Sequence, residues 1–194
     1  MNADFNPLVV IPVFDHEHAI GDVVDRVRRH GVPCLLVDDG SRASCAAVLD
    51  QLATRDGVSL LRLAQNQGKG GAVMAGLREA ARRGHSHALQ IDADGQHDAN
   101  DVPRFVAEAR AFPQHMVIGR PLFDASVPKA RLYGRYATHV WVWINTLSFE
   151  IIDSMCGFRV YPLAPTLALL DRVHIGRRMD FDTEVLVRLY WDGL

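Results

Sequence analysis

The sequence predicts a single α/β domain built on a mainly parallel, doubly wound sheet. Apolar runs rich in β-branched residues alternate along the chain with segments whose apolar residues repeat at helical spacing. Strands that alternate with helices in this way form a parallel sheet with helices on both faces. The chain has 194 residues, 48% of them hydrophobic, which suits one domain with a sizeable core.

The first elements are three strands with helices between them. The run "LVVIPVF" at 8–14 is continuously apolar, which is typical of a strand buried on both faces. A second buried strand that closes in a turn is expected at 34–41, in "CLLVDDGS", and a third strand at 58–63, in "VSLLRL". Helical spacing indicates helices after the first two strands; the apolar positions are Ile20, Val23, Val24 and Val27, then Ala47, Val48 and Leu52.

The alternation continues through the middle of the chain. An Ala-rich helix is expected at 69–84, and Gly84 ends it. A fourth strand follows at 87–92 and a fifth at 115–119. The helix between them has apolar residues at the period of a helix, namely Val102, Phe105, Val106 and Ala109.

Composition excludes several classes of protein. A formal net charge of -2 gives no general attraction to nucleic acid. The three cysteines are an odd number without a CxxC pair, which favours a reducing, cytoplasmic setting and excludes a zinc site made of cysteines alone. No window contains 18 uncharged apolar residues, so no membrane span is expected.

Polar residues follow four of the predicted strands, at the edge where such sheets bind ligands. They are Asp15 and Glu17, Asp38 and Asp39, Asn66 to Lys69, and Asp92 to Gln96. The loop that contains Gly68 and Lys69 matches neither GxxxxGK[ST] nor GxGxxG. A kinase or a dehydrogenase is therefore not expected.

The motif "DADGQH" indicates what this edge of the sheet binds. In extended backbone Asp92 and Asp94 point the same way, and two carboxylates make a hard, oxygen-only site that suits Mg²⁺ or Mn²⁺. Such an ion shares substrate phosphates, so a diphosphate is the expected ligand. The structural alternative is an Asx turn, in which the carboxylates accept bonds from nearby amides.

Six stretches in order resemble the family 2 glycosyltransferases of the GT-A fold, especially the dolichyl- or polyprenyl-phosphate mannose synthase branch. They are "VVIPVFDHE", "LLVDDGS", "NQGKGGAV", "QIDADGQH", "DSMCGFRVYP" and "FDTEVLVRLYWDG". The resemblance implies one GT-A domain over 1–194, with a nucleotide-sugar-binding half at 1–119 and an acceptor-side half at 120–194. It also implies inverting transfer of a sugar from a nucleotide diphosphosugar to an acceptor.

The resemblance assigns roles to residues at the sheet edge. The implied metal ligands are Asp92, Asp94 and Gln96. The implied nucleotide-binding residues are Pro12, Phe14, Glu17, Asp38, Asp39, Gly68, Lys69, Asp92 and Ala93. On this interpretation Asp39→Ala weakens nucleotide binding with little effect on the melting temperature. The alternatives are that Asp38 or Asp39 caps the next helix, and that Lys69 is a solvated residue at a helix start.

The second half of the chain concerns the acceptor. Arg120, Arg131 and Arg135 belong to a basic loop that is a candidate for binding the phosphate of a lipid acceptor. The alternative is a solvated basic loop. The resemblance adds Arg159 to the acceptor-binding residues. A hydroxyl acceptor would need a general base, for which Asp182, Glu184 and Asp153 are the candidates. A phosphate monoester, with a second pKa of roughly 6, is already ionised and needs none. The sequence leaves both acceptors open and favours a lipid-linked or polyprenyl-phosphate one, in envelope glycolipid or polysaccharide synthesis.

Three further expectations complete the interpretation. Trp141, Trp143 and Phe149 lie near the basic cluster, as in an interfacial helix, so peripheral contact with the inner face of the cell membrane is expected. The end of the chain in "LYWDGL" suggests a shortened C-terminus, because many relatives continue further. A nucleotidyltransferase is a weaker alternative, because "FDHEHAIGD" is acidic and poor in glycine. A non-catalytic nucleotide-sugar-binding protein is the other alternative.

Overall fold

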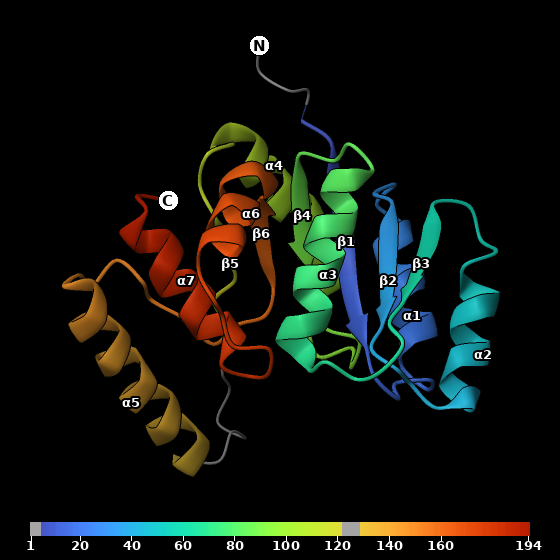
Figure 1. Ribbon diagram of the computed structural model, residues 1–194, viewed down its shortest axis with the longest axis horizontal. Helices are drawn as coiled ribbons and strands as arrows, with labels where there is room; N and C mark the ends of the chain where they lie inside the picture. The colour runs from blue at the N-terminus through green and yellow to red at the C-terminus, as the bar shows by residue number, and fades with distance from the viewer. Residues whose placement is uncertain (1–4, 122–128) are drawn as a thin grey trace.

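The computed structural model describes residues 5–121 and 129–194, with only the backbone described for residues 129–135 and 137. A six-stranded sheet lies between two layers of helices, in the strand order β3-β2-β1-β4-β6-β5 (Figure 1). The predicted α/β class with a mainly parallel sheet is confirmed.

The centre of the sheet is parallel, as predicted. Its strands are β1 (Pro7–Val13), β2 (Cys34–Asp38), β3 (Val58–Arg62) and β4 (His87–Gln90). β1 pairs in parallel with both β2 and β4, and its residues 8–13 are buried. The continuous apolar run is explained by helices that cover both faces of this strand.

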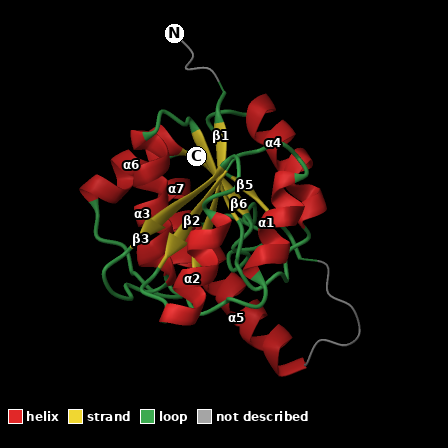
Figure 2. Cartoon of the chain, turned by 90° about the vertical axis from the view of Figure 1, so that its right-hand side faces the viewer, coloured by secondary structure: helices red, strands yellow, loops and turns green. Residues whose placement is uncertain are grey.

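Helices divide between the two faces of the sheet (Figure 2). One apolar cluster joins β1 to α1 (Ile20–Arg28), α2 (Ala43–Leu52) and α4 (Val102–Ala111). A second cluster joins the opposite face to α3 (Lys69–Arg82), α6 (Leu163–Arg172) and α7 (Phe181–Trp191). A short 3-10 turn, η1 (Ala99–Asp101), precedes α4.

One strand was not expected from the sequence. β6 (Arg159–Pro162) lies antiparallel to both β4 and β5 (Val117–Ile118) and separates them. It has only four residues, all buried. Because β6 comes from the second half of the chain and pairs with strands of the first, the two halves share one sheet.

Two predicted segments continue past the strands that they contain. β2 ends at Asp38, and the turn predicted to close the segment 34–41 follows it. β4 ends at Gln90, whereas the sequence extended it to 92. The residues beyond each strand form turns that contain Gly40 and Gly95, both with positive φ. The polar residues after these strands are therefore presented by turns.

Helix α5 (Lys129–Thr146) stands at the periphery and packs on α7 (Figure 1). Val142 joins Ile151, Leu186 and Val187 in a small separate apolar cluster. Large apolar side chains are exposed on α5 and in the turn after it, namely Tyr136, Val140, Trp141, Ile144, Leu147 and Phe149. Of these, Trp141 also lines a groove between α5 and α7. No helix in the described part of the chain is both long and apolar enough to cross a membrane.

Candidate active site

A cleft opens at the carboxyl ends of β1, β2 and β4, beside the start of α3. Its volume of about 450 Å³ lies within the range of small-molecule sites. The cleft is lined by Pro12, Val13, Phe14, His16, Asp39, Asn66, Gly68, Lys69, Ala72, Asp92, Ala93, Asp94, Arg178 and Met179. Most of the residues predicted to bind a nucleotide thus lie in one cavity, but Glu17 and Asp38 are not in its lining.

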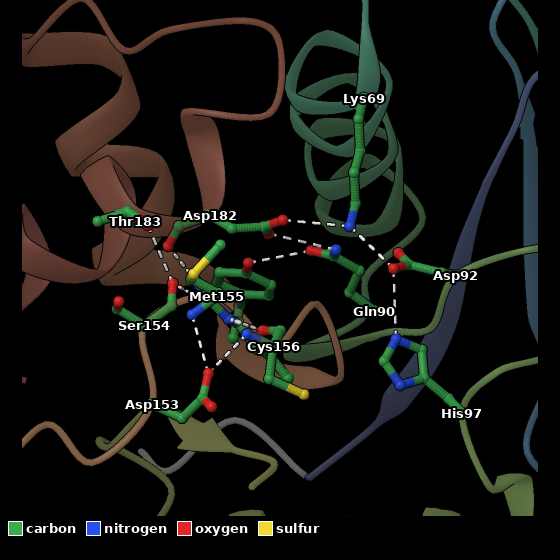
Figure 3. Close-up of polar contacts among 12 residues, drawn as sticks. Lys69, Gln90, Asp92, His97, Asp153, Ser154, Met155, Cys156, Asp182 and Thr183 are labelled. Carbon is green, nitrogen blue, oxygen red and sulfur yellow. Dashed lines mark hydrogen bonds and ion pairs between the residues drawn. The ribbon is translucent and has the colours of Figure 1, made fainter. Parts of the chain in front are cut away.

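The ammonium of Lys69 lies between two carboxylates at the base of the cleft (Figure 3). Its Nζ is 2.9 Å from Oδ2 of Asp92 and 3.1 Å from Oδ2 of Asp182. His97 approaches Asp92 from the other side, with Nε2 3.3 Å from the same Oδ2. This contact of His97 was not predicted, because the sequence gives no sign of which way the side chain turns.

The charges of Lys69 and Asp92 stabilise each other. Burial acts to lower the pKa of Lys69, but the carboxylates of Asp92 and Asp182 outweigh it and hold this pKa above its usual value. Burial acts to raise the pKa of Asp92, but the contacts with His97 and Lys69 outweigh it and hold this pKa well below its usual range. Both groups are therefore charged at neutral pH.

Asp92 and Asp94 are the cleft carboxylates that would hold a divalent cation together with a diphosphate. Oδ1 of Asp92 is buried without a hydrogen-bond partner among the described residues, and the exposed Asp94 lies in the cleft wall. No group of three His, Cys, Asp or Glu side chains in the described ranges is arranged to hold a metal. The remaining ligands would have to be water and substrate oxygens, as Mg²⁺ commonly has.

The geometric premise for the paired carboxylates was wrong. Residues 93 and 94 lie in a turn, not in extended backbone, and Oδ1 of Asp94 accepts a hydrogen bond from the amide of Gln96 at 3.0 Å. This local bond is the one expected for an Asx turn. Gln96 itself is exposed and lines a groove beside α4, so the structure does not bring the third predicted ligand into the cleft.

The two aspartates after β2 have different surroundings. Asp38 is buried, and its carboxylate accepts bonds from the amide of Ser41 and from Nε of Arg62. Burial acts to raise the pKa of Asp38, but these bonds outweigh it and lower that pKa. The nucleotide contact predicted for Asp38 finds no support in this arrangement, because its carboxylate is sequestered in the turn.

Asp39 lines the cleft and also holds its floor. Its carboxylate accepts bonds from the amides of Gln67, at 2.7 Å, and Gly68, at 3.0 Å. Burial raises the pKa of Asp39, although these bonds oppose the shift. Asp39 thus fixes the loop before α3, and not the helix after its own turn as the capping alternative proposed.

The start of α3 is crossed by a segment from near the C-terminus. The amide of Gly71 donates a hydrogen bond to the carbonyl of Arg177, and a Cβ on Gly70 would collide with Phe181. This approach brings Arg178 and Met179 into the cleft. Both were missed, because the sequence gives no measure of how closely two distant segments approach; the glycine pair after Lys69 was the only signal.

The wall after β1 contains Pro12, Phe14 and His16. Phe14 is 46% exposed, which leaves its ring available to a ligand. Glu17 instead accepts a bond from the hydroxyl of Ser44 at 3.1 Å. The predicted role of Glu17 in shaping the nucleoside pocket is therefore not supported by its position.

The three candidate bases are all engaged by other groups. Asp182 is 4% exposed and pairs with Lys69. Glu184 accepts bonds from the amide of Gly176 and from Arg188. Asp153 is buried and accepts bonds from the amides of Met155 and Cys156. Of the three, Asp182 contacts Lys69, a residue that lines the cleft.

The four predicted acceptor arginines do not form one described cluster. Arg120 is exposed just after β5. The side chains of Arg131 and Arg135 lie outside the described residues. Arg159 is fully buried, and its guanidinium donates to the carbonyls of Ser154, Cys156 and Asp182. The predicted acceptor contact of Arg159 is corrected, because its donors are occupied by backbone oxygens.

Relatives with similar sequences include enzymes named for dolichyl phosphate. The chain is 31% identical over 165 residues to a dolichyl-phosphate beta-glucosyltransferase of Dictyostelium discoideum, which covers 78% of this chain and 49% of the relative. It is 23% identical over 197 residues to a UDP-N-acetylglucosamine--dolichyl-phosphate N-acetylglucosaminyltransferase of Methanococcus voltae, covering 92% and 78% of the two chains.

A third relative belongs to the predicted branch. A polyprenol monophosphomannose synthase of Mycolicibacterium smegmatis is 35% identical over 104 residues, which are 51% of this chain and 39% of that protein. The chain thus spans from about two fifths to about four fifths of the length of these three relatives.

The fold and the sequence family agree. Glucosyl-3-phosphoglycerate synthase from Mycobacterium tuberculosis, solved with UDP, superposes with a TM-score of 0.72 at 16% identity, over 98% of this chain and 67% of that one. At this identity the likeness concerns the fold alone. Residues 8–175 match the sequence family described as Glycosyl transferase family 2. The chain therefore belongs to glycosyl transferase family 2, with a GT-A fold and relatives in the dolichyl- and polyprenyl-phosphate branch.

Proposed function

We propose that this protein transfers a sugar from a nucleotide diphosphosugar to a lipid phosphate. The proposal rests on the cleft, whose lining contains Lys69, Asp92 and Asp94 together with Phe14 and Asp39. Relatives named for dolichyl phosphate and for polyprenol monophosphomannose support the choice of acceptor. A nucleotidyltransferase and a non-catalytic binding protein are not favoured by these relatives.

The donor would lie along the cleft with its base towards Phe14 and its diphosphate towards Lys69. Phe14 offers an exposed ring, and Asp39 fixes the loop at the floor. The start of α3 favours an anion, because its first amides and the helix dipole are positive. Lys69 adds a full charge at the first residue of this helix.

Asp92 and Asp94 would hold Mg²⁺ or Mn²⁺ against the diphosphate. Such an ion supplies Lewis-acid stabilisation of the charge on a departing diphosphate. Lys69 supplies the same kind of stabilisation from the protein itself, because it lies in a partly water-excluded site where charge interactions are strong.

The three candidate bases already have hydrogen-bond or ion-pair partners, which favours a phosphate acceptor. Asp153, Asp182 and Glu184 each accept bonds or pair with a cation in place of facing the open cleft. A hydroxyl acceptor needs one of them to take its proton. An ionised phosphate attacks without this step, and its own charge calls for cationic residues such as Arg178 at the cleft.

The exposed apolar side of α5 supports peripheral contact with a membrane at its cytoplasmic face. Trp141 and Ile144 are 64% and 59% exposed and lie three residues apart on one face of the helix. Aromatic and aliphatic side chains on one face of a helix are typical of an interfacial segment. A lipid-linked acceptor would be presented at that surface.

Calorimetry with UDP and GDP, in Mn²⁺ and in EDTA, tests the donor site. We expect one nucleotide diphosphate to bind in Mn²⁺ and to bind much more weakly in EDTA. Asp94→Ala should abolish the effect of Mn²⁺. Asp98→Ala is the matched control, because Asp98 makes the same kind of local bond, to the amide of Asn100, outside the cleft lining. Equal affinity in EDTA and Mn²⁺ would refute the metal role.

Turnover on a polyprenyl phosphate tests the acceptor. Loss of a true general base slows the chemical step by about 10²–10⁴-fold. We expect Glu184→Gln and Asp153→Asn to retain turnover within about ten-fold of the unmodified protein, well short of that loss, while Arg131→Ala falls further. If either carboxylate variant is nearly inactive and Arg131→Ala is nearly normal, the acceptor is a hydroxyl.

A further inference from the structure

The contact between Lys69 and Asp92 engages the carboxylate of one of the predicted metal ligands. Nζ of Lys69 is 2.9 Å from Oδ2 of Asp92, and His97 contacts that oxygen as well. A divalent ion binds carboxylate oxygens at roughly 2.0–2.1 Å for Mg²⁺. An ammonium beside the same carboxylate repels such an ion, because both are positive.

Asp182 gives Lys69 a second partner that lies away from the predicted metal ligands. Its Oδ2 is 3.1 Å from Nζ, and its other oxygen faces the amide of Gln90 at 3.5 Å. Gln90 in turn accepts a bond from the hydroxyl of Tyr161, and Arg159 donates to the backbone carbonyl of Asp182. These residues are buried, so their contacts hold Asp182 in position beside Lys69.

Gly157 limits the directions in which Lys69 can move. A Cβ on Gly157 would lie 2.7 Å from Nζ of Lys69 and 2.9 Å from Oδ2 of Asp92. The backbone at residue 157 therefore packs directly against the ion pair. The open side of Lys69 is the cleft, whose lining it shares with Asp94 and Arg178.

We propose that Lys69 is a placeholder cation that covers Asp92 in the empty enzyme, and that Asp182 is the positioning residue that retains Lys69 when it leaves Asp92 for the diphosphate. This inference rests on the proposed donor site. On arrival of the diphosphate, Lys69 exchanges one carboxylate partner for a phosphate oxygen and keeps the other. The exchange makes Asp92 available to the divalent ion only when the nucleotide is present.

The consequence is a binding order. Mn²⁺ alone binds weakly to the unmodified protein, because Lys69 occupies its ligand. Mn²⁺ and nucleoside diphosphate together bind strongly, because the diphosphate neutralises Lys69 and completes the coordination of the ion. The synergy between Mn²⁺ and the nucleoside diphosphate therefore arises from the side chain of Lys69 and does not require movement of the backbone.

Binding of Mn²⁺ alone, followed by the loss of the free-ion signal in electron paramagnetic resonance, tests the placeholder role. Lys69→Met should bind Mn²⁺ alone about ten-fold more tightly or better, because a like charge next to the ion is removed. Lys69→Gln serves as a second variant if the first folds poorly. Arg178→Met is the matched control, because it removes a charge from the same cleft without touching Asp92.

Asp182→Asn tests the positioning role. With Asp182 neutral, Lys69 has Asp92 as its remaining carboxylate partner and leaves it at greater cost. We expect Mn²⁺ binding in the presence of UDP or GDP to weaken about ten-fold in Asp182→Asn. The same change should have little effect in the Lys69→Met background, since residues that act through one another are not additive. A purely structural role for Asp182 would weaken binding equally in both backgrounds.

The outcomes separate this inference from the proposed function. If the unmodified protein binds no nucleotide with Mn²⁺, the donor site itself is wrong. If it binds both together, but Lys69→Met gains no affinity for Mn²⁺ alone or gains no more than Arg178→Met, the placeholder role is overturned. Additive effects of Asp182→Asn and Lys69→Met would overturn the positioning role.

Discussion

Replacing Asp39 by alanine should destabilise the fold as well as weaken nucleotide binding. The carboxylate accepts two backbone hydrogen bonds, from Gln67 at 2.7 Å and from Gly68 at 3.0 Å, and the side chain is 2% exposed. A hydrogen bond to a charged group contributes about 1.5–3 kcal/mol. Burial raises the pKa of Asp39, which shows that the charged form bears a desolvation cost, so the lower end of that range applies to each bond.

The expected loss is therefore about 3 kcal/mol in the free energy of unfolding. For a chain of this length that corresponds to a fall in Tm of about 6–12 °C. Asp39→Asn keeps one acceptor oxygen and should lose about half as much. Thermal unfolding followed by circular dichroism measures both. A Tm for Asp39→Ala within about 2 °C of the unmodified protein would refute the structural role of these bonds.

Three other perturbations give distinct outcomes. Gly157→Ala should cost about 1–3 kcal/mol in stability, as overpacking does, and weaken Mn²⁺-dependent nucleotide binding; a normal variant would show that Lys69 and Asp92 can shift freely. Burial raises the pKa of the Cys34 thiol to about 11, so this thiol stays protonated when folded while it ionises near 8.5 unfolded. Stability should then fall as pH rises from about 9 to 11, measured by urea unfolding; a flat or rising midpoint contradicts this. Flotation with anionic liposomes at low salt should recover the protein, and Ile144→Glu should reduce the recovery; a wholly unbound protein counts against membrane contact.

The sequence predicted those parts of the fold that local patterns determine. The continuous apolar run at 8–14 became the central strand β1, because helices cover both of its faces. Asp39, Lys69 and Asp92, each from the segment after a different strand, line one cleft, because the carboxyl ends of parallel strands lie together. The predicted polar residues Asp15 and Glu17 do not line it. The four-residue strand β6 escaped prediction, because so short a run has no periodicity to detect.

The site was harder to predict than the fold. Asp38 and Asp39 are adjacent and chemically identical. Only tertiary contacts determine that Asp38 pairs with Arg62 and that Asp39 accepts a bond from the loop before α3. The expected small effect of Asp39→Ala on the melting temperature is revised for this reason. Arg159 looked like an acceptor residue, but its guanidinium bonds three backbone carbonyls. No one-dimensional pattern distinguishes a buried arginine from an exposed one.

The crossing of α3 by residues 176–181 bears on the order in which the site is made during synthesis. The strands that form the cleft edge are complete by residue 90, yet Arg178, Met179 and Asp182 come from far later in the chain. A nascent chain can assemble the central sheet early, since β1, β2, β3 and β4 pair with one another. Lys69 then has Asp92 as a partner but lacks Asp182. The proposed donor site is thus complete only when residues 178–182 have packed against α3, so it depends on contacts between segments more than 100 residues apart in the chain.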